Sequence, residues 1–235
     1  MSNHHPTAYR LIVSPTAVAA AAAAAGAVAK VLRSSVASRG AATVAVSGGS
    51  TPSLFLRALA EEPLPWPNIH IFQVDERIAP DGDIHRNAVE LVNALFEVPL
   101  PDPNIHLMDV VGQDPEIAAT AYASLLRTWC PDGLDAIHLG LGEDGHTASL
   151  VPGDPVLDVT DRRVAVTGEY QGHRRITLTY PELARAQHVV WLATGAAKSS
   201  AVRRLLAHDV GIPAGRVQAQ DCAVFTDPLG AGEVS

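Results

Sequence analysis

One apolar run, residues 134–141, constrains the fold of this chain more than any other stretch. It reads LDAIHLGL and has the length and composition of a buried β-strand. The run stops at Gly142-Glu143-Asp144-Gly145, where glycine permits backbone conformations and close approaches that a Cβ atom blocks. Aromatic residues make up only 5% of the sequence, so the core must consist of Ala, Val, Leu and Ile, which suits parallel strands covered by helices. We therefore expect an α/β protein.

Two residues with catalytic potential, Asp144 and His146, lie at this glycine-rich turn. Ligands of α/β sheets bind beyond the carboxyl ends of the strands. A histidine is mostly neutral near pH 7, so it can accept a proton at such a position. His146 is therefore a candidate catalytic base. A hydrogen-bonded structural role is the commoner one for a lone histidine, and the sequence alone leaves both roles open.

Cofactor and metal patterns are weak in this chain. Residues 140–145 match the dinucleotide-binding pattern G-x-G-x-x-G, but Pro152 follows too soon for a long helix that would hold a pyrophosphate. We expect no nicotinamide or flavin cofactor. The ten histidines include no i, i+4 pair typical of a metalloprotease helix, so we expect no metal site. Cys130 and Cys222 form no C-x-x-C motif, which favours a reducing cytoplasm over a disulfide framework.

Size and charge narrow the class of protein. A length of 235 residues with 47% hydrophobic residues suits one domain over residues 1–235, with flexible tails at 1–7 and 228–235. The formal net charge of -8 argues against a broad surface for nucleic acid or for an anionic membrane. We therefore expect neither partner.

An alanine-rich segment, residues 18–28, resembles a signal-peptide core in composition. Alanine is a strong helix former but a weak membrane anchor, and Lys30 soon interrupts the run. Ser14 is a candidate N-cap, Pro15 suits the first helical position, and Gly40 suits the position after the last turn. The segment therefore predicts the first helix of the domain.

Strand and helix patterns alternate along the rest of the chain, which is typical of a parallel sheet with crossover helices. We expect strands at residues 9–13, 43–46, 69–74, 104–108, 134–141, 163–167, 175–179, 188–194 and 223–226. We expect further helices at residues 53–60, 86–96, 115–129, from 181 onward, and 195–207.

A glycine-hydroxyl loop, Ser47-Gly48-Gly49-Ser50-Thr51-Pro52, joins the predicted strand at 43–46 to the next helix. Strand, loop and helix in this order can cradle a phosphate, because free backbone N–H groups and small hydroxyls donate to the anion. A tight turn that needs glycine explains the loop equally well. The loop is not a Walker A motif, since no lysine follows in register, and Ser47 does not lie in a G-x-S-x-G motif.

Charged residues follow two other predicted strands. Asp75-Glu76-Arg77 ends the strand at 69–74, where such residues are either solvated loop charges or site residues. Asn87, at the next helix, is a candidate cap or ligand contact. Lys198 lies near the start of a helix, where a positive charge is unfavourable unless an anion lies beside it. It is either a surface lysine or a partner of a phosphate.

Four of these blocks together resemble the signature of the 6-phosphogluconolactonase family, in its order and spacing and over nearly the whole chain. They are residues 47–52, 75–77, 140–153 and 195–198. The resemblance implies an open, mostly parallel, Rossmann-like α/β sheet flanked by helices, related to glucosamine-6-phosphate deaminase and ribose-5-phosphate isomerase. It also implies hydrolysis of 6-phospho-D-glucono-1,5-lactone to 6-phospho-D-gluconate in the oxidative pentose phosphate pathway, without a cofactor.

The resemblance also assigns roles to residues. It makes His146 the general base that activates water, while Asp144 either orients the imidazole or stabilises the turn. It implies contacts with the substrate or its phosphate for Ser47, Gly48, Gly49, Ser50, Thr51, Asp75, Arg77, Gly145, Arg175 and Lys198. Arg174 adjoins Arg175, so the sequence leaves open which of the two faces the substrate. The implied partner is a small phosphorylated sugar lactone, bound by a monomer or a small homo-oligomer.

Two alternative functions remain. The related deaminases carry an acidic residue five positions after the histidine and a tyrosine at the position of Arg77, whereas this chain has Val151 and Arg77. An aldose–ketose rearrangement moves protons between neighbouring carbons and needs that carboxylate, so its absence favours lactone hydrolysis. Many members have Phe at the position of Val151, a difference that affects packing. The second alternative is a non-catalytic sugar-phosphate sensor, but this sequence contains no basic helix-turn-helix pattern.

Overall fold

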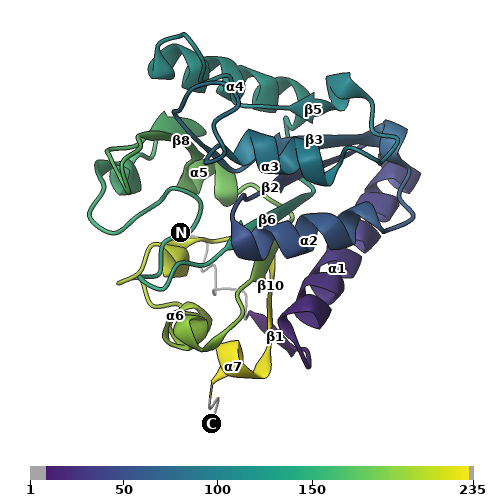
Figure 1. The fold of residues 1–235 in the computed structure, drawn as a ribbon, viewed down its shortest axis with the longest axis vertical. Helices are drawn as coiled ribbons and strands as arrows, with labels where there is room; N and C mark the ends of the chain where they lie inside the picture. The colour runs from purple at the N-terminus through teal and green to yellow at the C-terminus, as the bar shows by residue number, and fades with distance from the viewer. Residues whose placement is uncertain (1–8, 233–235) are drawn as a thin grey trace, which may run out of the picture.

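The central element is a seven-stranded sheet with the order β1-β10-β9-β6-β2-β3-β5, in which every neighbouring pair is parallel (Figure 1). The computed structural model describes residues 9–232, with only the backbone at Ser50, so the tails predicted at 1–7 and 233–235 lie outside the described residues. The strands are β1 (Arg10–Val13), β2 (Ala42–Val46), β3 (Ile69–Gln73), β5 (Ile105–His106), β6 (Ala136–Gly140), β9 (His188–Leu192) and β10 (Asp221–Thr226). The predicted open, mostly parallel α/β fold is confirmed.

Side chains of the central strands alternate between two hydrophobic cores, one on each face of the sheet. In β2, Val44 and Val46 point into the core that contains α1 and α2, while Ala45 points into the core that contains α4 and α6. Because both faces are covered, these strands are apolar without interruption, and every residue of β2 is buried. The low aromatic content is therefore compatible with a sizeable core.

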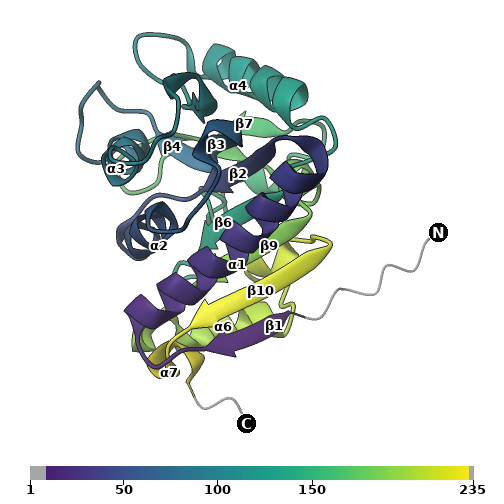
Figure 2. The same ribbon diagram turned by 90° about the vertical axis from the view of Figure 1, so that its right-hand side faces the viewer.

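Helices cover both faces (Figures 1 and 2). The α-helices are α1 (Ala17–Arg39), α2 (Ser50–Ala60), α3 (Asn87–Ala94), α4 (Pro115–Trp129), α5 (Tyr180–Leu183), α6 (Ser199–Leu206) and α7 (Pro228–Ala231). Short 3-10 helices are η1 (Trp66–Asn68), η2 (Asp102–Asn104), η3 (Pro155–Asp158), η4 (Ala196–Lys198) and η5 (Ala214–Arg216).

The first helix is long and apolar enough to cross a membrane by length and composition. In the fold, however, α1 runs along the sheet over β9 and β10, and its buried alanines pack into the core (Figure 2). It begins at Ala17 with Thr16 as N-cap, whose side chain accepts a hydrogen bond from the Ala19 N–H at 3.1 Å. The prediction of Ser14 as N-cap is therefore wrong, because the Ser14 N–H donates to the Thr226 carbonyl and extends the pairing with β10. The predicted stop at Gly40 is confirmed by its left-handed conformation.

A second, three-stranded antiparallel sheet has the order β4-β8-β7. It consists of β4 (Asp75–Arg77), β7 (Val164–Val166) and β8 (Arg175–Leu178). The charged residues predicted at the end of the third strand therefore form a strand of their own. Glu76 is fully buried, and its carboxylate accepts the N–H groups of Asn87 and Ala88 at 2.7 and 2.9 Å. This carboxylate fixes the start of α3.

The C-terminal segment departs from prediction. Residues 228–231 form α7, so the flexible tail predicted from residue 228 is wrong over that range. Asp227 is the N-cap and accepts a hydrogen bond from the Gly230 N–H at 2.8 Å, while Pro228 takes the first turn. This cap and the packing of α7 on α6 offset the conformational entropy that residues 228–231 lose when they form a helix.

Candidate active site

A cavity of about 370 Å³ opens at the carboxyl ends of β2, β6 and β9, where an α/β sheet binds its ligands. The loop after β2 contributes Ser47, Gly48, Gly49 and Thr51 to its lining. The rest of the wall includes Asp75, Arg77, His146, Arg175 and Lys198. Residues far apart in the sequence are thus brought together by strand ends that share one edge of the fold.

His146 is held by a carboxylate. Its Nδ1 lies 2.6 Å from Asp144 Oδ1, and its backbone N–H donates to the same oxygen at 3.1 Å. Burial raises the pKa of Asp144, but the hydrogen bonds and the charge of His146 outweigh burial, and the net pKa lies below its usual value. An ionised Asp144 accepts a hydrogen bond from Nδ1–H, so the neutral imidazole carries its lone pair on Nε2. Asp144 therefore both orients the ring and stabilises the turn, two roles that the sequence left as alternatives.

The turn that carries this pair tolerates only glycine at two positions. A Cβ atom on Gly142 would lie 2.1 Å from His146 Nδ1. Gly145 has a φ of +83°, and a Cβ there would lie 2.5 Å from the Ile212 side chain. Gly145 itself does not line the cavity, and the structure shows this packing role for it, while its contact with substrate stays a prediction. Thr147 and Leu150 form a β-bridge after the turn in place of the helix that a dinucleotide site needs.

The predicted phosphate loop is fixed from two sides. Ser47 donates through both its N–H and its hydroxyl to the His138 carbonyl, each at 3.2 Å. Gly48 packs so closely on Asn87 that a Cβ would lie 2.4 Å from Asn87 Oδ1. The Gly49 N–H donates to Glu90 Oε2 at 2.7 Å, so the prediction that this N–H is free for a phosphate does not match the structure. In the first turn of α2, Pro52 has no N–H and the Ser53 N–H donates to the Gly49 carbonyl at 2.9 Å, so the backbone N–H groups of residues 50 and 51 are the ones that lack intrahelical acceptors.

A buried polar cluster forms the floor of the cavity. Ser149 donates to Asp75 Oδ2 at 2.5 Å, and Asn87 Nδ2 donates to Asp75 Oδ1 at 3.2 Å. Arg175 is 5% exposed, and its Nε and Nη2 atoms have no hydrogen-bond partner within the described residues. Burial lowers the pKa of Arg175, Asp75 opposes this effect, and the charge of Arg77 adds to it. An anion in the cavity would relieve this buried, underpaired guanidinium.

The choice between the two neighbouring arginines follows from the register of the small sheet. Arg175 pairs with Arg77 across β8 and β4, and both line the cavity. Arg174 is exposed, and its Nε donates to the Thr167 carbonyl at 3.4 Å. Since side chains alternate along a strand, only one of two adjacent arginines can face the cavity, and it is Arg175.

Two residues of this region have no signal in the sequence. Tyr170 meets the His146 ring edge-on, with centroids 5.6 Å apart, and its hydroxyl lies 3.4 Å from Asp144 Oδ2. The Arg175 guanidinium lies over the Tyr170 ring at 5.2 Å. Gln171 lines the cavity with a φ of +52°. Both lie in the connection between β7 and β8, and only the pairing of those strands brings it to the His146 turn.

The described residues contain no group of three His, Cys, Asp or Glu side chains able to hold a metal ion. The lining of the cavity instead combines one imidazole, the Asp75 carboxylate, two arginines and one lysine. Such a set can bind an anionic ligand and transfer a proton beside it.

Comparisons with known proteins show the family and the fold. The model of the family described as glucosamine-6-phosphate isomerases/6-phosphogluconolactonase matches residues 15–226. A 6-phosphogluconolactonase from Synechocystis sp. is 38% identical over 208 residues, which cover 84% of this chain and 86% of that protein. The crystal structure of 6-phosphogluconolactonase from Thermotoga maritima has a TM-score of 0.84 at 26% identity and covers 93% of this chain and 99% of that one.

A monomeric glucosamine-6-phosphate deaminase has nearly the same backbone, with a TM-score of 0.82 at 19% identity, covering 94% of this chain and 98% of that one. At this identity the likeness shows the fold alone, and the fold does not separate the two activities. The match of the family model over most of the sequence, together with the Synechocystis relative, does show kinship: the chain belongs to the glucosamine-6-phosphate isomerase/6-phosphogluconolactonase family.

Proposed function

We propose that this protein is a cytoplasmic 6-phosphogluconolactonase that hydrolyses 6-phospho-D-glucono-1,5-lactone to 6-phospho-D-gluconate in the oxidative pentose phosphate pathway. One observation carries the proposal: the His146 turn and the loop before α2 line the same cavity. A base and an anion cradle within one cavity suit a substrate with a phosphate at one end and a lactone carbonyl at the other. The names of the relatives support the same activity.

The substrate phosphate binds to the first turn of α2, Thr51 and Lys198, with Arg175 and Arg77 on the adjoining wall. A dianionic phosphate forms charge-assisted hydrogen bonds, which are roughly twice as strong as neutral ones. The N-terminal end of a helix adds a favourable dipole. This binding positions the lactone carbonyl beside His146, and positioning is a large part of what a slowly hydrolysing lactone needs.

His146 Nε2 removes a proton from water while the oxygen of that water attacks C1. Asp144 stabilises the imidazolium that forms. The tetrahedral intermediate then collapses, the bond between C1 and the ring oxygen breaks, and the imidazolium returns the proton to that ring oxygen. The products are one hydroxyl and one carboxylic acid, which releases its proton to solvent to become the carboxylate, and neither a covalent intermediate nor a cofactor is required. Developing charge on the carbonyl oxygen is stabilised by donors of the cavity.

The test compares two histidines. His188 also pairs with a carboxylate, since its Nδ1 lies 2.9 Å from Asp221 Oδ2, but it lies at the amino end of β9, away from the cavity. We expect His146→Ala to lower kcat for freshly prepared lactone by about 10²- to 10⁴-fold and His188→Ala to leave kcat within about twofold. Equal kcat values for His146→Ala and wild type would contradict the base assignment.

A second arm of the same assay addresses the deaminase alternative. Val151, five positions after His146, is buried and provides no carboxylate. Wild-type protein should therefore release no ammonia from glucosamine 6-phosphate while it hydrolyses the lactone. Ammonia release without lactone hydrolysis would reverse the proposal, and binding of both sugar phosphates without turnover would indicate a sensor.

A further inference from the structure

Lys198 lies at the end of a short turn that has little stability of its own. The turn begins at Gly195, whose φ of +90° lies in the region that favours glycine, and the Lys198 N–H donates to the Gly195 carbonyl at 3.0 Å. Nothing lies within 4 Å of the position of a Cβ on Gly195. Since glycine has the largest backbone freedom of any residue, packing alone does not hold the start of this turn.

One carboxylate oxygen fixes the start of the 195–198 turn through a hydrogen bond. Asp227 Oδ1 accepts the Gly195 N–H at 2.8 Å and the Gly230 N–H at 2.8 Å. Asp227 is only 7% exposed, so these are shielded hydrogen bonds to a charged acceptor. The same oxygen therefore joins the turn that carries Lys198 to the first turn of α7.

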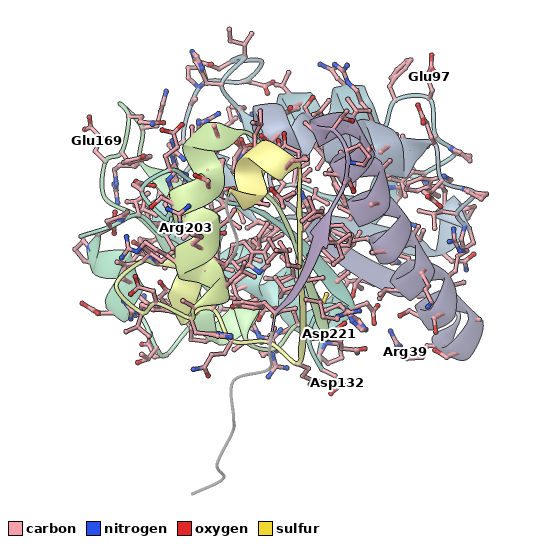
Figure 3. The ribbon with its side chains drawn as sticks, turned by 90° about the horizontal axis from the view of Figure 1, so that it is seen from below. Arg39, Glu97, Asp132, Glu169, Arg203 and Asp221 are labelled. Atoms are coloured by element: carbon pink, nitrogen blue, oxygen red, sulfur yellow. The ribbon has the colours of Figure 1, made fainter. Side chains whose placement is uncertain are left out.

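The C-terminal helix is itself fixed to the elements next to the turn. α7 lies against α6 and η4 (Figures 1 and 3). A Cβ on Gly230 would lie 2.3 Å from Thr226 Oγ1 and 2.9 Å from the Ala193 carbonyl, and Ala193 lines the cavity. A Cβ on Gly232 would lie 3.2 Å from Ser199 Cβ, next to Lys198. Asp227 thus acts from a rigid support.

From this geometry we infer that Asp227 is a positioning residue for substrate binding: it orders the 195–198 turn so that the Lys198 ammonium is directed at the phosphate before substrate arrives. The inference rests on the proposed phosphate-binding role of Lys198. A turn ordered in advance loses less conformational entropy when the ligand binds, so Asp227 should lower KM and leave the proton transfers at His146 unaffected. Asp227 does not line the cavity and acts only through Lys198.

A purely structural role for Asp227, as the N-cap of α7, gives different results. In that case, replacing Asp227 would lower the stability of the fold but would not change how much Lys198 contributes to substrate binding. Asp114 is a matched control, because its carboxylate also caps a helix, accepting the Glu116 N–H at 2.8 Å, and it lies outside the cavity.

The experiment is a double-mutant cycle on the full chain with Lys198→Ala, Asp227→Ala and the double variant. It measures kcat and KM for the lactone and, independently of turnover, the Kd of the product 6-phosphogluconate by calorimetry. We expect Lys198→Ala to raise KM and Kd by about 10- to 100-fold, and Asp227→Ala by about 5- to 20-fold with kcat within about twofold. In the Lys198→Ala background, Asp227→Ala should add less than about twofold.

Three further variants separate a positioning role of Asp227 from a purely structural one. Asp227→Asn retains an acceptor for both N–H groups, so it should restore most of the product affinity. Gly195→Ala strains the turn while Asp227 stays in place, and it should raise KM without needing any change at α7. Asp114→Ala should lower the melting temperature and leave KM unchanged.

Two results would overturn this inference without affecting the proposed function. One is an unchanged KM in both Asp227→Ala and Gly195→Ala. The other is an equal effect of Asp227→Ala on KM and Kd with and without Lys198. An unchanged KM and Kd in Lys198→Ala would remove both the lysine from the phosphate site and the role of Asp227, while lactone hydrolysis would stand. If the wild type showed no lactone turnover, the proposed reaction would be refuted. If the effects of the two substitutions on product affinity were still non-additive, the positioning role of Asp227 would nevertheless be supported.

Discussion

The His146 turn and the loop before α2 line the same cavity but are stabilised in different ways. In the His146 turn, the functional side chain is paired with Asp144, and it packs so closely on Gly142 that a Cβ there would lie 2.1 Å from Nδ1. On the anion side of the cavity, the loop donors of Ser47 and Gly49 are already paired, but the buried Nε and Nη2 atoms of Arg175 in β8 have no hydrogen-bond partner within the described residues. A proton-transfer group must be in place before the reaction, whereas an anion site gains its binding energy only if its donors are free until the ligand arrives.

Apart from the loss of His146 itself, the largest effect should come from filling the space behind the imidazole. Gly142→Ala places a methyl group where His146 Nδ1 and Asp144 Oδ1 now lie, with Cβ distances of 2.1 and 2.5 Å. We expect kcat to fall by about 100-fold with KM nearly unchanged, because the ring moves and the anion site does not. Steady-state kinetics would check this, with Gly26→Ala in α1 as the control for glycine replacement, because a Cβ there would lie 3.5 Å from its nearest neighbour, Glu62 Oε1. A raised KM with normal kcat would show that the two regions are not separate.

The opposite pattern is expected on the anion side. Arg175→Ala removes a buried guanidinium from the wall of the cavity and should raise KM for the lactone by about 10- to 50-fold with a smaller change in kcat. Arg174→Ala is the matched control, since its side chain is exposed and faces away. If Arg174→Ala raised KM as much as Arg175→Ala, the assignment from strand register would be contradicted.

Acid should lower the free energy of unfolding through His138, which lies next to the loop before α2. The His138 carbonyl accepts from Ser47, its ring stacks on Phe55 at 3.8 Å, and complete burial lowers its pKa to about 3. The folded state binds the proton less well than the unfolded state does, so the stabilisation is present above about pH 6.5 and decreases as pH falls toward 3. Unfolding free energy should drop by about 1 to 2 kcal/mol between pH 6.5 and 5 from this group.

The control for this pH effect is His138→Leu, which keeps an apolar side chain of similar size. Neither ring nitrogen of His138 has a hydrogen-bond partner within the described residues, so the replacement leaves no partner unpaired. Denaturant unfolding at several pH values should give a flatter profile for this variant. An unchanged slope would assign the acid sensitivity to other groups, such as His106, whose pKa burial lowers to about 4.

The smallest effect tests Tyr170, which contacts both regions. Tyr170 meets His146 and Asp144 on one side and Arg175 on the other. Tyr170→Phe removes a long hydrogen bond of 3.4 Å and keeps the ring, so kcat should fall by only about two- to fivefold. Tyr170→Ala should also raise KM, because Arg175 loses its aromatic neighbour. Identical kinetics for both variants would show that the ring contributes nothing.

Local patterns in the sequence predict much of this protein. The apolar run that became β6, the glycines around His146 and the Pro115 helix start follow from backbone preferences and periodicity, and they reappear in the structure. The predicted charged end at Asp75-Glu76-Arg77 became a strand with a buried Glu76, because a carboxylate satisfied by the start of α3 is stable inside the fold. The charge of Glu76 in the sequence does not by itself predict that its carboxylate is buried and hydrogen-bonded in this way.

The sequence by itself determined the α/β class, the order of most elements, apart from β4 and α7, and the residue types able to bind an anion or accept a proton. Only the tertiary structure decided that Arg175 rather than Arg174 faces the cavity, that the Gly49 N–H is taken by Glu90, and that Asp227 holds the turn of Lys198. The reason is physical: propensities and glycine requirements act over a few residues, whereas these contacts join positions that only the packed sheet brings together.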